Sequence, residues 1–395
     1  MNRESDCDIA IGECLAKIAR QPKVKTTDYL ESGAFPVIDQ GTKFVGGYVN
    51  DESLLYSGPL PVVIFGDHNR HIKFAKRPFA VGADGTQLRY PDERFDISYF
   101  YYAIRALPLK NYGYERHFKY LKEERLRVRP LNVQRRIAAI LSAYDDLIEN
   151  NTRRIAILEE MARRIYEEWF VRFRFPGREG VRMVESELGL VPEGWLVQAA
   201  STAMDINPST KVPKEGLKPF LAMNCLSDGS MLIDAPGERD GNSGSKFRNG
   251  DTLFARITPC LENGKTGFVQ FLPSDDAVAF GSTEFIVLRS RTLTPEFVYL
   301  LARSDAFRDN AIKSMSGASG RQRVREACFD TFLLANPDRA TLATFAAVTR
   351  PMFQLIQSLA LKNSNLRKTR DLLLPKLISG QLDVPAVPAP EDATA

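Results

Sequence analysis

Apolar residues in this sequence follow two different periods, which alternate along the chain. Residues 1–131 contain short apolar runs, such as residues 61–65, that end at Gly and Asp residues, and this pattern predicts strands joined by turns. From Asn132 onward, apolar residues recur at alternating spacings of four and three positions, which predicts a long helix with a coiled-coil seam. The seam positions, nine of ten apolar, are Ile137, Leu141, Tyr144, Ile148, Asn151, Ile155, Leu158, Ala162, Ile165 and Trp169.

The same succession occurs a second time. Residues 187–336 return to short strands and turns, and a second helical run extends from about Thr341 to Ser379, just before Gly380. The two seams lie 208 residues apart, position for position, so the sequence indicates an internal repeat of a globular unit followed by a long helix. The second seam, seven of ten apolar, comprises Phe345, Thr349, Met352, Ile356, Leu359, Asn363, Leu366, Arg370, Leu373 and Leu377.

This repeat predicts an α+β fold in which two mixed α/β units are separated by two long helices. Helices that end two similar units are expected to pair as an antiparallel coiled coil, with the units related by an approximate two-fold axis. A seam of 33 residues is about 50 Å long at roughly 1.5 Å per residue, about one to one and a half turns of DNA. The predicted divisions are a first unit at 1–131, a helix at 132–175, a second unit at 176–340 with a linker at 176–186, a helix at 341–380 and a disordered tail at 381–395.

Two asparagines predict the register of this helix pair. In an antiparallel pair, facing residue numbers have a constant sum, and flush seams place Ile137 opposite Leu377, with a sum of 514. The same sum places Asn151 opposite Asn363, the only asparagines in the two seams. Facing amides can satisfy each other, and a slip by one heptad would leave both against apolar side chains. The alternative is that both asparagines lie at the solvated edge of the seam.

The composition of the chain argues against membrane, secreted and disulfide-rich classes of protein. With 44% hydrophobic and 26% charged residues, the chain of 395 residues has the composition of an ordinary folded protein, and a net charge of +4 implies no particular partner. It has no run of 18 apolar residues and no signal-peptide core at its start, so we expect a soluble, cytoplasmic protein. Five scattered cysteines without a CxxC motif argue against a disulfide framework or a zinc site, and the pair His68 and His71 is expected in a surface loop.

Motifs of catalysis are incomplete in this sequence. Residues 263–266 resemble the end of a phosphate-binding loop, but Pro259 occupies the place of its first glycine. Asn207 and Asn336 are each followed by proline but lack the second proline and the aromatic residue of the amino-methyltransferase motif. The sequence therefore offers no convincing catalytic site, and no metal site is expected.

Basic and aromatic residues gather at corresponding places in the two halves. Residues 110–136 contain nine Lys or Arg and three acidic residues, with aromatic residues between them, and residues 313–325 combine basic side chains with Gly and Ser. Such loops can approach phosphates and grip base edges, so two matching clusters favour DNA binding over a merely solvated charged face. The candidate DNA-binding residues are His68, Asn69, Arg70, Lys73, Tyr114, Arg116 and Lys119 in the first unit, and Arg256, Lys265, Ser319, Arg321, Gln322 and Arg323 in the second.

Six segments of the chain match patterns of a known family: 130–137, 149–158 and 369–380 in the helices, and 250–260, 281–285 and 316–323 in the second unit. Through them, and over essentially its full length, the chain resembles the specificity subunits of type I restriction-modification systems. The helical match is the most specific part of this resemblance, and the segments of the second unit resemble patterns common in target recognition domains of that family.

The resemblance implies a non-catalytic reader of double-stranded DNA, in which each recognition domain binds one half of a bipartite target. The helices would set the spacing and dock two modification (methyltransferase) subunits, which carry S-adenosylmethionine. Restriction subunits that use ATP and Mg would join this complex, whereas this chain would hold no cofactor and contact no membrane. The alternatives are a DNA methyltransferase or restriction enzyme with its own catalytic site, or a purely structural coiled-coil scaffold.

Overall fold

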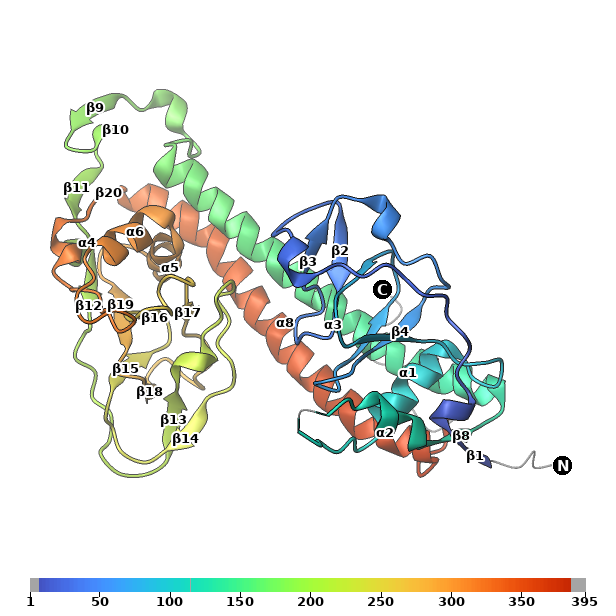
Figure 1. The fold of residues 1–395 in the computed structure, drawn as a ribbon. Helices are drawn as coiled ribbons and strands as arrows, with labels where there is room; N and C mark the ends of the chain where they lie inside the picture. The colour runs from blue at the N-terminus through green and yellow to red at the C-terminus, as the bar shows by residue number, and fades with distance from the viewer. Residues whose placement is uncertain (1–6, 114, 385–395) are drawn as a thin grey trace. The chain divides into compact units, whose positions relative to one another are not determined.

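The computed structural model describes residues 7–113 and 115–384, and the chain divides into two compact units. The first comprises residues up to 149 together with those from 364 onward, and the second comprises residues 150–363. Two long helices, α3 (Leu131–Tyr166) and α8 (Arg339–Ser379), each contribute one segment to either unit (Figure 1). Each unit is therefore completed by residues from distant parts of the sequence.

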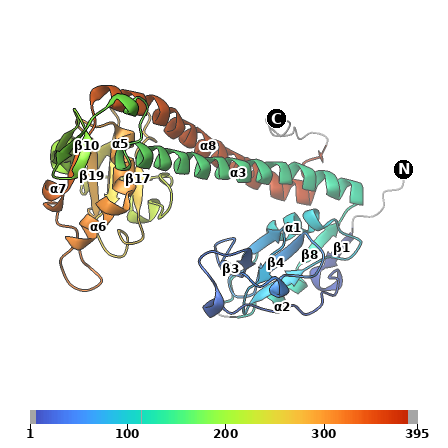
Figure 2. The same cartoon turned by 90° about the horizontal axis from the view of Figure 1, so that it is seen from above.

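The first unit contains three small sheets. These sheets are β1 (Cys7–Ala10) with β8 (Arg125–Val128); β3 (Gly47–Val49), β2 (Phe35–Ile38) and β6 (Ala80–Val81); and β5 (Ile72–Ala75), β4 (Val62–Gly66) and β7 (Thr86–Arg89). Strands β4 and β7 are antiparallel, β2 and β6 are parallel, and β4 is buried along its whole length because both of its faces are covered. Helix α1 (Ile97–Arg105) packs against β4 and β5, and its N-cap is Asp96, whose carboxylate accepts hydrogen bonds from the backbone N–H groups of Ser98 and Tyr99 (Figure 2). The short helices are η1 (Ile11–Glu13), η2 (Thr26–Asp28), η3 (Glu52–Leu54) and α2 (Phe118–Glu123).

The second unit contains the same kinds of sheet with additional strands. Within the predicted linker 176–186 lie the short helix η5 (Arg178–Gly180) and the strand β9. Its sheets are β9 (Met183–Ser186) with β10 (Gly189–Pro192); β11 (Leu196–Ala199) with β20 (Leu333–Asn336); β12 (Met204–Ile206), β19 (Phe285–Ser290), β16 (Thr252–Ala255) and β17 (Thr266–Phe268); and β14 (Gly237–Arg239), β13 (Lys218–Leu221), β18 (Val278–Gly281) and β15 (Ser245–Arg248). The helices are α4 (Ala200–Ala203), η6 (Met223–Cys225), α5 (Pro295–Arg303), α6 (Asp305–Lys313) and α7 (Cys328–Thr331).

The two units share one strand order. The sheet β3-β2-β6 of the first corresponds to β14-β13-β18 of the second, and the second strand of each is parallel to the third. Likewise β5-β4-β7 corresponds to β17-β16-β19, and the pair β1 and β8 corresponds to β11 and β20. The helix that follows β7 is α1, and the helix that follows β19 is α5. This common topology agrees with the internal repeat that the sequence indicates.

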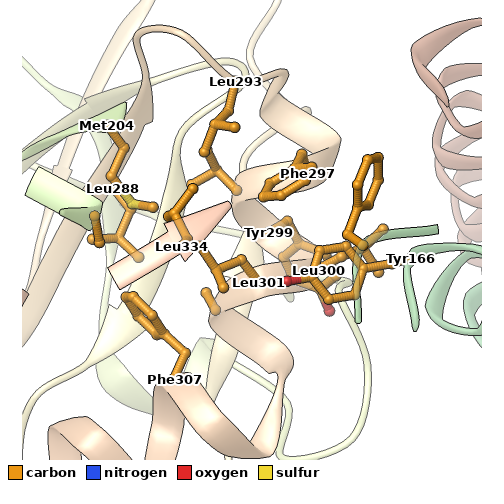
Figure 3. Close-up of a cluster of buried hydrophobic side chains, with 14 of the residues drawn as sticks. Tyr166, Met204, Leu288, Leu293, Phe297, Tyr299, Leu300, Leu301, Phe307 and Leu334 are labelled. Atoms are coloured by element: carbon orange, nitrogen blue, oxygen red, sulfur yellow. The ribbon is translucent and has the colours of Figure 1, made fainter. Parts of the chain in front are cut away.

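Part of the core of the second unit forms where the end of α3 packs on α5. Tyr166 and Phe170 lie one helical turn apart and pack their rings against Phe297 of α5, with centroids 5.2 and 4.6 Å from it. Figure 3 shows Tyr166 in a cluster of buried side chains that come from strands, from α5, such as Phe297, and from α6 (Asp305–Lys313), such as Phe307. The last turn of the helix (Glu167–Val171) widens into a π-helix. These contacts anchor α3 to the domain in addition to the seam between helices.

Within each unit, the segments of α3 and α8 run in opposite directions. In the second unit, Trp169 lies 5.8 Å from Phe345 between ring centroids, and Asn151 lies against Asn363. Both pairs have the residue-number sum 514. Asn151 Nδ2 donates a hydrogen bond of 3.0 Å to Asn363 Oδ1, and the two residues are 4% and 2% exposed. The amides thus lie in the buried part of the helix contact and not at its solvated edge.

The first unit holds the other two helix segments. Ile137 of α3 and Leu377 of α8 are fully buried in one hydrophobic cluster, and Arg370 forms an ion pair with Asp145. Val384, in the predicted disordered tail, is buried in the same cluster, and the rest of that tail, 385–395, lies outside the described residues. None of the described helices is long and apolar enough to cross a membrane.

Candidate nucleic-acid interface

The turn after β4 in the first unit carries His68, Asn69 and Arg70. His68 is exposed. The side chain of Asn69 is partly buried, and its Nδ2 donates a hydrogen bond to the backbone carbonyl of Gln40. Arg70 adopts a positive φ of 62°, and its Nη1 donates a 2.9 Å hydrogen bond to the carbonyl of Leu109. Asn69 and Arg70 therefore fix the turn, and His68 is the side chain of the three that it presents to solvent.

Lys73 lies inside the unit and does not reach the surface predicted for it. Residues 73 and 75 are the buried members of the alternating strand β5. The Lys73 ammonium donates to the carbonyl oxygens of Asp39, at 2.7 Å, and Lys43, and it forms an ion pair of 3.6 Å with the Asp39 carboxylate. Burial lowers the pKa of Lys73, while Asp39 acts in the opposite direction. Lys73 thus holds the loop of residues 39–44 from within.

The basic segment before α2 is exposed. Arg116 and Lys119 both face solvent, and Tyr114 lies outside the described residues. The Lys119 ammonium is 2.6 Å from Glu115, and hydrogen bonds to Glu115 and then to Tyr120 raise its pKa. Arg116 is exposed and has no hydrogen-bond or ion-pair partner within the part of the chain that the structure describes, so its charge is free.

A buried histidine, which the sequence did not single out, anchors this segment. His117 is 2% exposed, its Nε2 accepts a 3.1 Å hydrogen bond from the Tyr112 N–H, and its Nδ1 lies 3.0 Å from the carbonyl oxygen of Asp67. Because Nε2 accepts, Nδ1 carries the proton and donates to that carbonyl. The Asp67 carboxylate in turn accepts a 2.8 Å bond from the N–H of Phe118. Sequence spacing gave no signal for this arrangement, since residues 67 and 117 lie far apart in the chain.

In the second unit, Arg323 is the most firmly held of the candidate residues. Its backbone N–H and carbonyl both pair with Ser316, at 2.9 and 3.0 Å. Its guanidinium forms three hydrogen bonds with Glu284, from Nε at 2.9 and 3.1 Å and from Nη2 at 2.7 Å. These bonds lower the pKa of Glu284, and the Arg323 side chain remains 49% exposed. The pair is therefore ionised, ordered and accessible.

The rest of the Gly/Ser loop is more open. Ser319 and Arg321 are exposed, whereas Gln322 is partly buried. The backbone of Gln322 pairs with Thr258, donating to its Oγ1 at 3.1 Å and accepting from its N–H at 3.1 Å. Arg321 has no ion-pair partner among the described residues, so its charge is available to a ligand.

Arg256 and Lys265 are largely occupied by the protein. Arg256 lies 3.3 Å from Glu326, and its Nε is buried without an acceptor in the described chain. The Lys265 ammonium donates to the carbonyl of Leu226 at 2.6 Å and is 3.4 Å from Asp228. Lys265 therefore secures a loop and is not free for a ligand. Arg256 contributes to a polar hollow of about 420 Å³, which Asn207, Thr210, Lys246 and Thr283 also line.

These loops supply hydrogen-bond donors and positive charge. Among residues 7–113 and 115–384, no group of three His, Cys, Asp or Glu side chains is placed to hold a metal ion. The five cysteines are unpaired. The exposed cations and hydrogen-bond donors of these loops thus suit contact with anionic groups and hydrogen-bond acceptors.

Comparisons with known proteins identify a common type of relative. No family model matches the chain. The specificity subunit of the type I restriction enzyme MjaIX from Methanocaldococcus jannaschii is 23% identical over 338 residues, which cover 80% of this chain and 75% of that protein. The EcoEI specificity subunit from Escherichia coli is 30% identical over 154 residues, which cover 37% of this chain and 26% of that protein.

A solved structure agrees at the level of the fold. The crystal structure of a type I restriction-modification system S subunit from M. genitalium matches with a TM-score of 0.55 and 13% identity, and the match covers 95% of this chain and 97% of that one. The chain thus has the fold of an S subunit, with mixed helices and strands and long helices. The sequence resemblance is confirmed: over most of its length, this chain is similar to the specificity subunits of type I restriction enzymes.

Proposed function

We propose that this chain is the non-catalytic specificity subunit of a type I restriction-modification complex and recognises a bipartite sequence in double-stranded DNA. The observation that carries this proposal is the repeat of one strand order in two units, each with an exposed arginine in a loop held by buried contacts. Two similar readers in one chain suit a target with two separated halves. The names of the curated relatives, all specificity subunits, support the same function.

The recognition domains are assigned to residues 1–131 and 176–340, and the helices at 132–175 and 341–380 form the antiparallel coiled coil between them. In this proposal the helices set the spacing of the two DNA halves and dock two modification subunits. The buried hydrogen bond between Asn151 and Asn363 supports a register role for these residues. A slipped pairing would leave both amides without a partner, which costs about 1–3 kcal/mol for each.

The proposed partners supply the cofactors. The modification subunits would bind S-adenosylmethionine, and restriction subunits would bind ATP and Mg. DNA contacts are assigned first to His68 and Arg116 in one unit, and to Ser319, Arg321 and Arg323 in the other, because these side chains are exposed. The complex would act in the cytoplasm, where its DNA substrate lies.

A domain exchange tests this proposal. Residues 187–336 are replaced by the same region of a relative with a different target, and methylated sites are mapped in cells that carry the modification subunits. We expect one half of the recognised sequence to change and the other to remain. The reciprocal exchange of residues 1–131 is the matched control and should change only the other half. A change of both halves, or of neither, in either exchange would contradict the two-reader proposal.

A further inference from the structure

The loops around Arg323 belong to an arrangement that occurs in both units. In the second unit, Arg256 follows β16 directly, and its N–H donates to the carbonyl of Glu284, just before β19, at 3.0 Å. The carbonyl of Arg256 accepts a 2.9 Å bond from the N–H of Val324. Three segments are thereby tied together at a single residue.

The first unit repeats these ties with other residues. Asp67 follows β4 closely, and its N–H donates to the carbonyl of Gly85, just before β7, at 2.8 Å. Its carbonyl accepts a 2.8 Å bond from the N–H of His117. Asp67, Gly85 and His117 therefore correspond to Arg256, Glu284 and Val324. The residue before His117 is Arg116, and the residue before Val324 is Arg323, so the two exposed arginines occupy equivalent places.

The equivalent arginines differ in what holds them. Glu284 stands where the first unit has Gly85, so only Arg323 has a carboxylate partner at this place. Glu284 occupies Nε and one side of Nη2 of Arg323. Nη1 has no acceptor within the described chain, so the outer edge of the guanidinium, formed by Nη1 and Nη2, retains free donors. That edge matches the O6 and N7 acceptors of guanine, the most frequent partner of arginine in base recognition.

Arg323 and Arg321 differ in whether a carboxylate neutralises their charge, and this difference suggests different roles. The Glu284 carboxylate neutralises Arg323, which weakens its attraction to a phosphate but leaves its outer hydrogen-bond donors directed. Arg321, two residues away, is exposed and keeps its full charge. Resting on the function proposed above, we propose that Arg323 reads a guanine of the second half-site through Nη1 and Nη2, with Glu284 as its positioning residue, while Arg321 contacts the phosphate backbone.

The test uses the full-length chain in complex with its modification subunits, which selects target sequences from random duplex DNA. Arg323→Lys keeps the charge and removes the paired donors, so we expect the preference for guanine at one position of one half to fall roughly 5- to 150-fold. Glu284→Gln should weaken the preference at that same position. Arg321→Gln should instead weaken binding to all sequences alike and lower its dependence on salt.

Arg291→Lys is the matched control. Arg291 is also half-exposed and paired with a carboxylate, that of Asp205, but its Nη1 is occupied by the carbonyls of Ser201 and Thr202, so base preference should not change. Thermal unfolding verifies that each variant is folded. An unchanged preference with Arg323→Lys, or a uniform loss in a folded variant, would overturn the assignment. If the wild-type complex selects no bipartite sequence, the proposed function itself is wrong. The wild-type protein alone reveals this result, so it is distinguishable from a failure of the assignment of Arg323.

Discussion

Replacing Asn363 by alanine tests whether the buried amide pair stabilises the helix contact. The substitution removes the acceptor of the 3.0 Å bond and leaves the Asn151 amide 4% exposed without that partner. An unsatisfied buried amide costs about 1–3 kcal/mol, and the higher helix propensity of alanine offsets about 0.5 kcal/mol. Asn363 also donates to Thr152 Oγ1, but Thr152 is exposed and can bind water instead. We therefore expect a net loss of about 1–2 kcal/mol in the free energy of unfolding.

The assay is thermal and urea unfolding of the full-length chain. For a unit the size of residues 150–363, the expected loss corresponds to a melting temperature lower by about 2–8 °C. Asn365→Ala is the control, because Asn365 is exposed on the same helix and gains the same helix propensity. Replacing Asn151 and Asn363 together by leucine removes both amides and should restore most of the stability. The reasoning is refuted if Asn363→Ala costs no more than Asn365→Ala, or if the double leucine variant is less stable than Asn363→Ala.

Three further predictions concern the loops and the helices. Lys73→Met should lower the free energy of unfolding by about 1–3 kcal/mol, because the Asp39 and Lys43 carbonyls lose their donor, while the salt dependence of DNA binding stays unchanged. The exposed Lys76→Met is its control, and a reduced salt slope with Lys73→Met would show that Lys73 contacts DNA after all. The pKa of Glu284 is lower in the folded protein than in the unfolded chain. The ion pair with Arg323 therefore stabilises the fold at pH values above the unfolded-state pKa, and this stabilisation is lost as the pH falls through the folded-state pKa. The stability difference between the wild type and Glu284→Gln should thus shrink on acid titration, and a difference independent of pH from 7 to 3 would count against it. Inserting one heptad after Glu149 and one after Asn363, where the units meet in sequence, should lengthen the DNA spacer by about three base pairs at unchanged half-sites. Mapping of methylated sites checks this, and an unchanged spacer would exclude the helices as the determinant of spacing.

The local periodicity of apolar residues predicts much of the architecture, above all the two long helices. The heptad spacing predicts a helix from 132 and another from 341, and α3 begins at Leu131 and α8 at Arg339. A seam of alternating fours and threes is specific to helices that contact one another, so it can be read without any knowledge of distant contacts. Even so, the buried side chains at the end of α3 include Tyr166 and Phe170, which lie outside the predicted seam and pack on α5. Their position depends on a third element that the period of the helix cannot reveal.

The candidate interface depended far more on tertiary structure. Composition marked the basic loops, but it could not distinguish Lys73, which points inward on an alternating strand, from the exposed Arg116. The partner of Arg323 is Glu284, 39 residues earlier, and only the pairing of strands brings the two together. The repeat and the helices can be predicted from the sequence, because hydrophobic periodicity is a local property of the chain. Which charged side chains are held, buried or free cannot be predicted in this way, because hydrogen bonds and ion pairs form between segments that become neighbours only on folding.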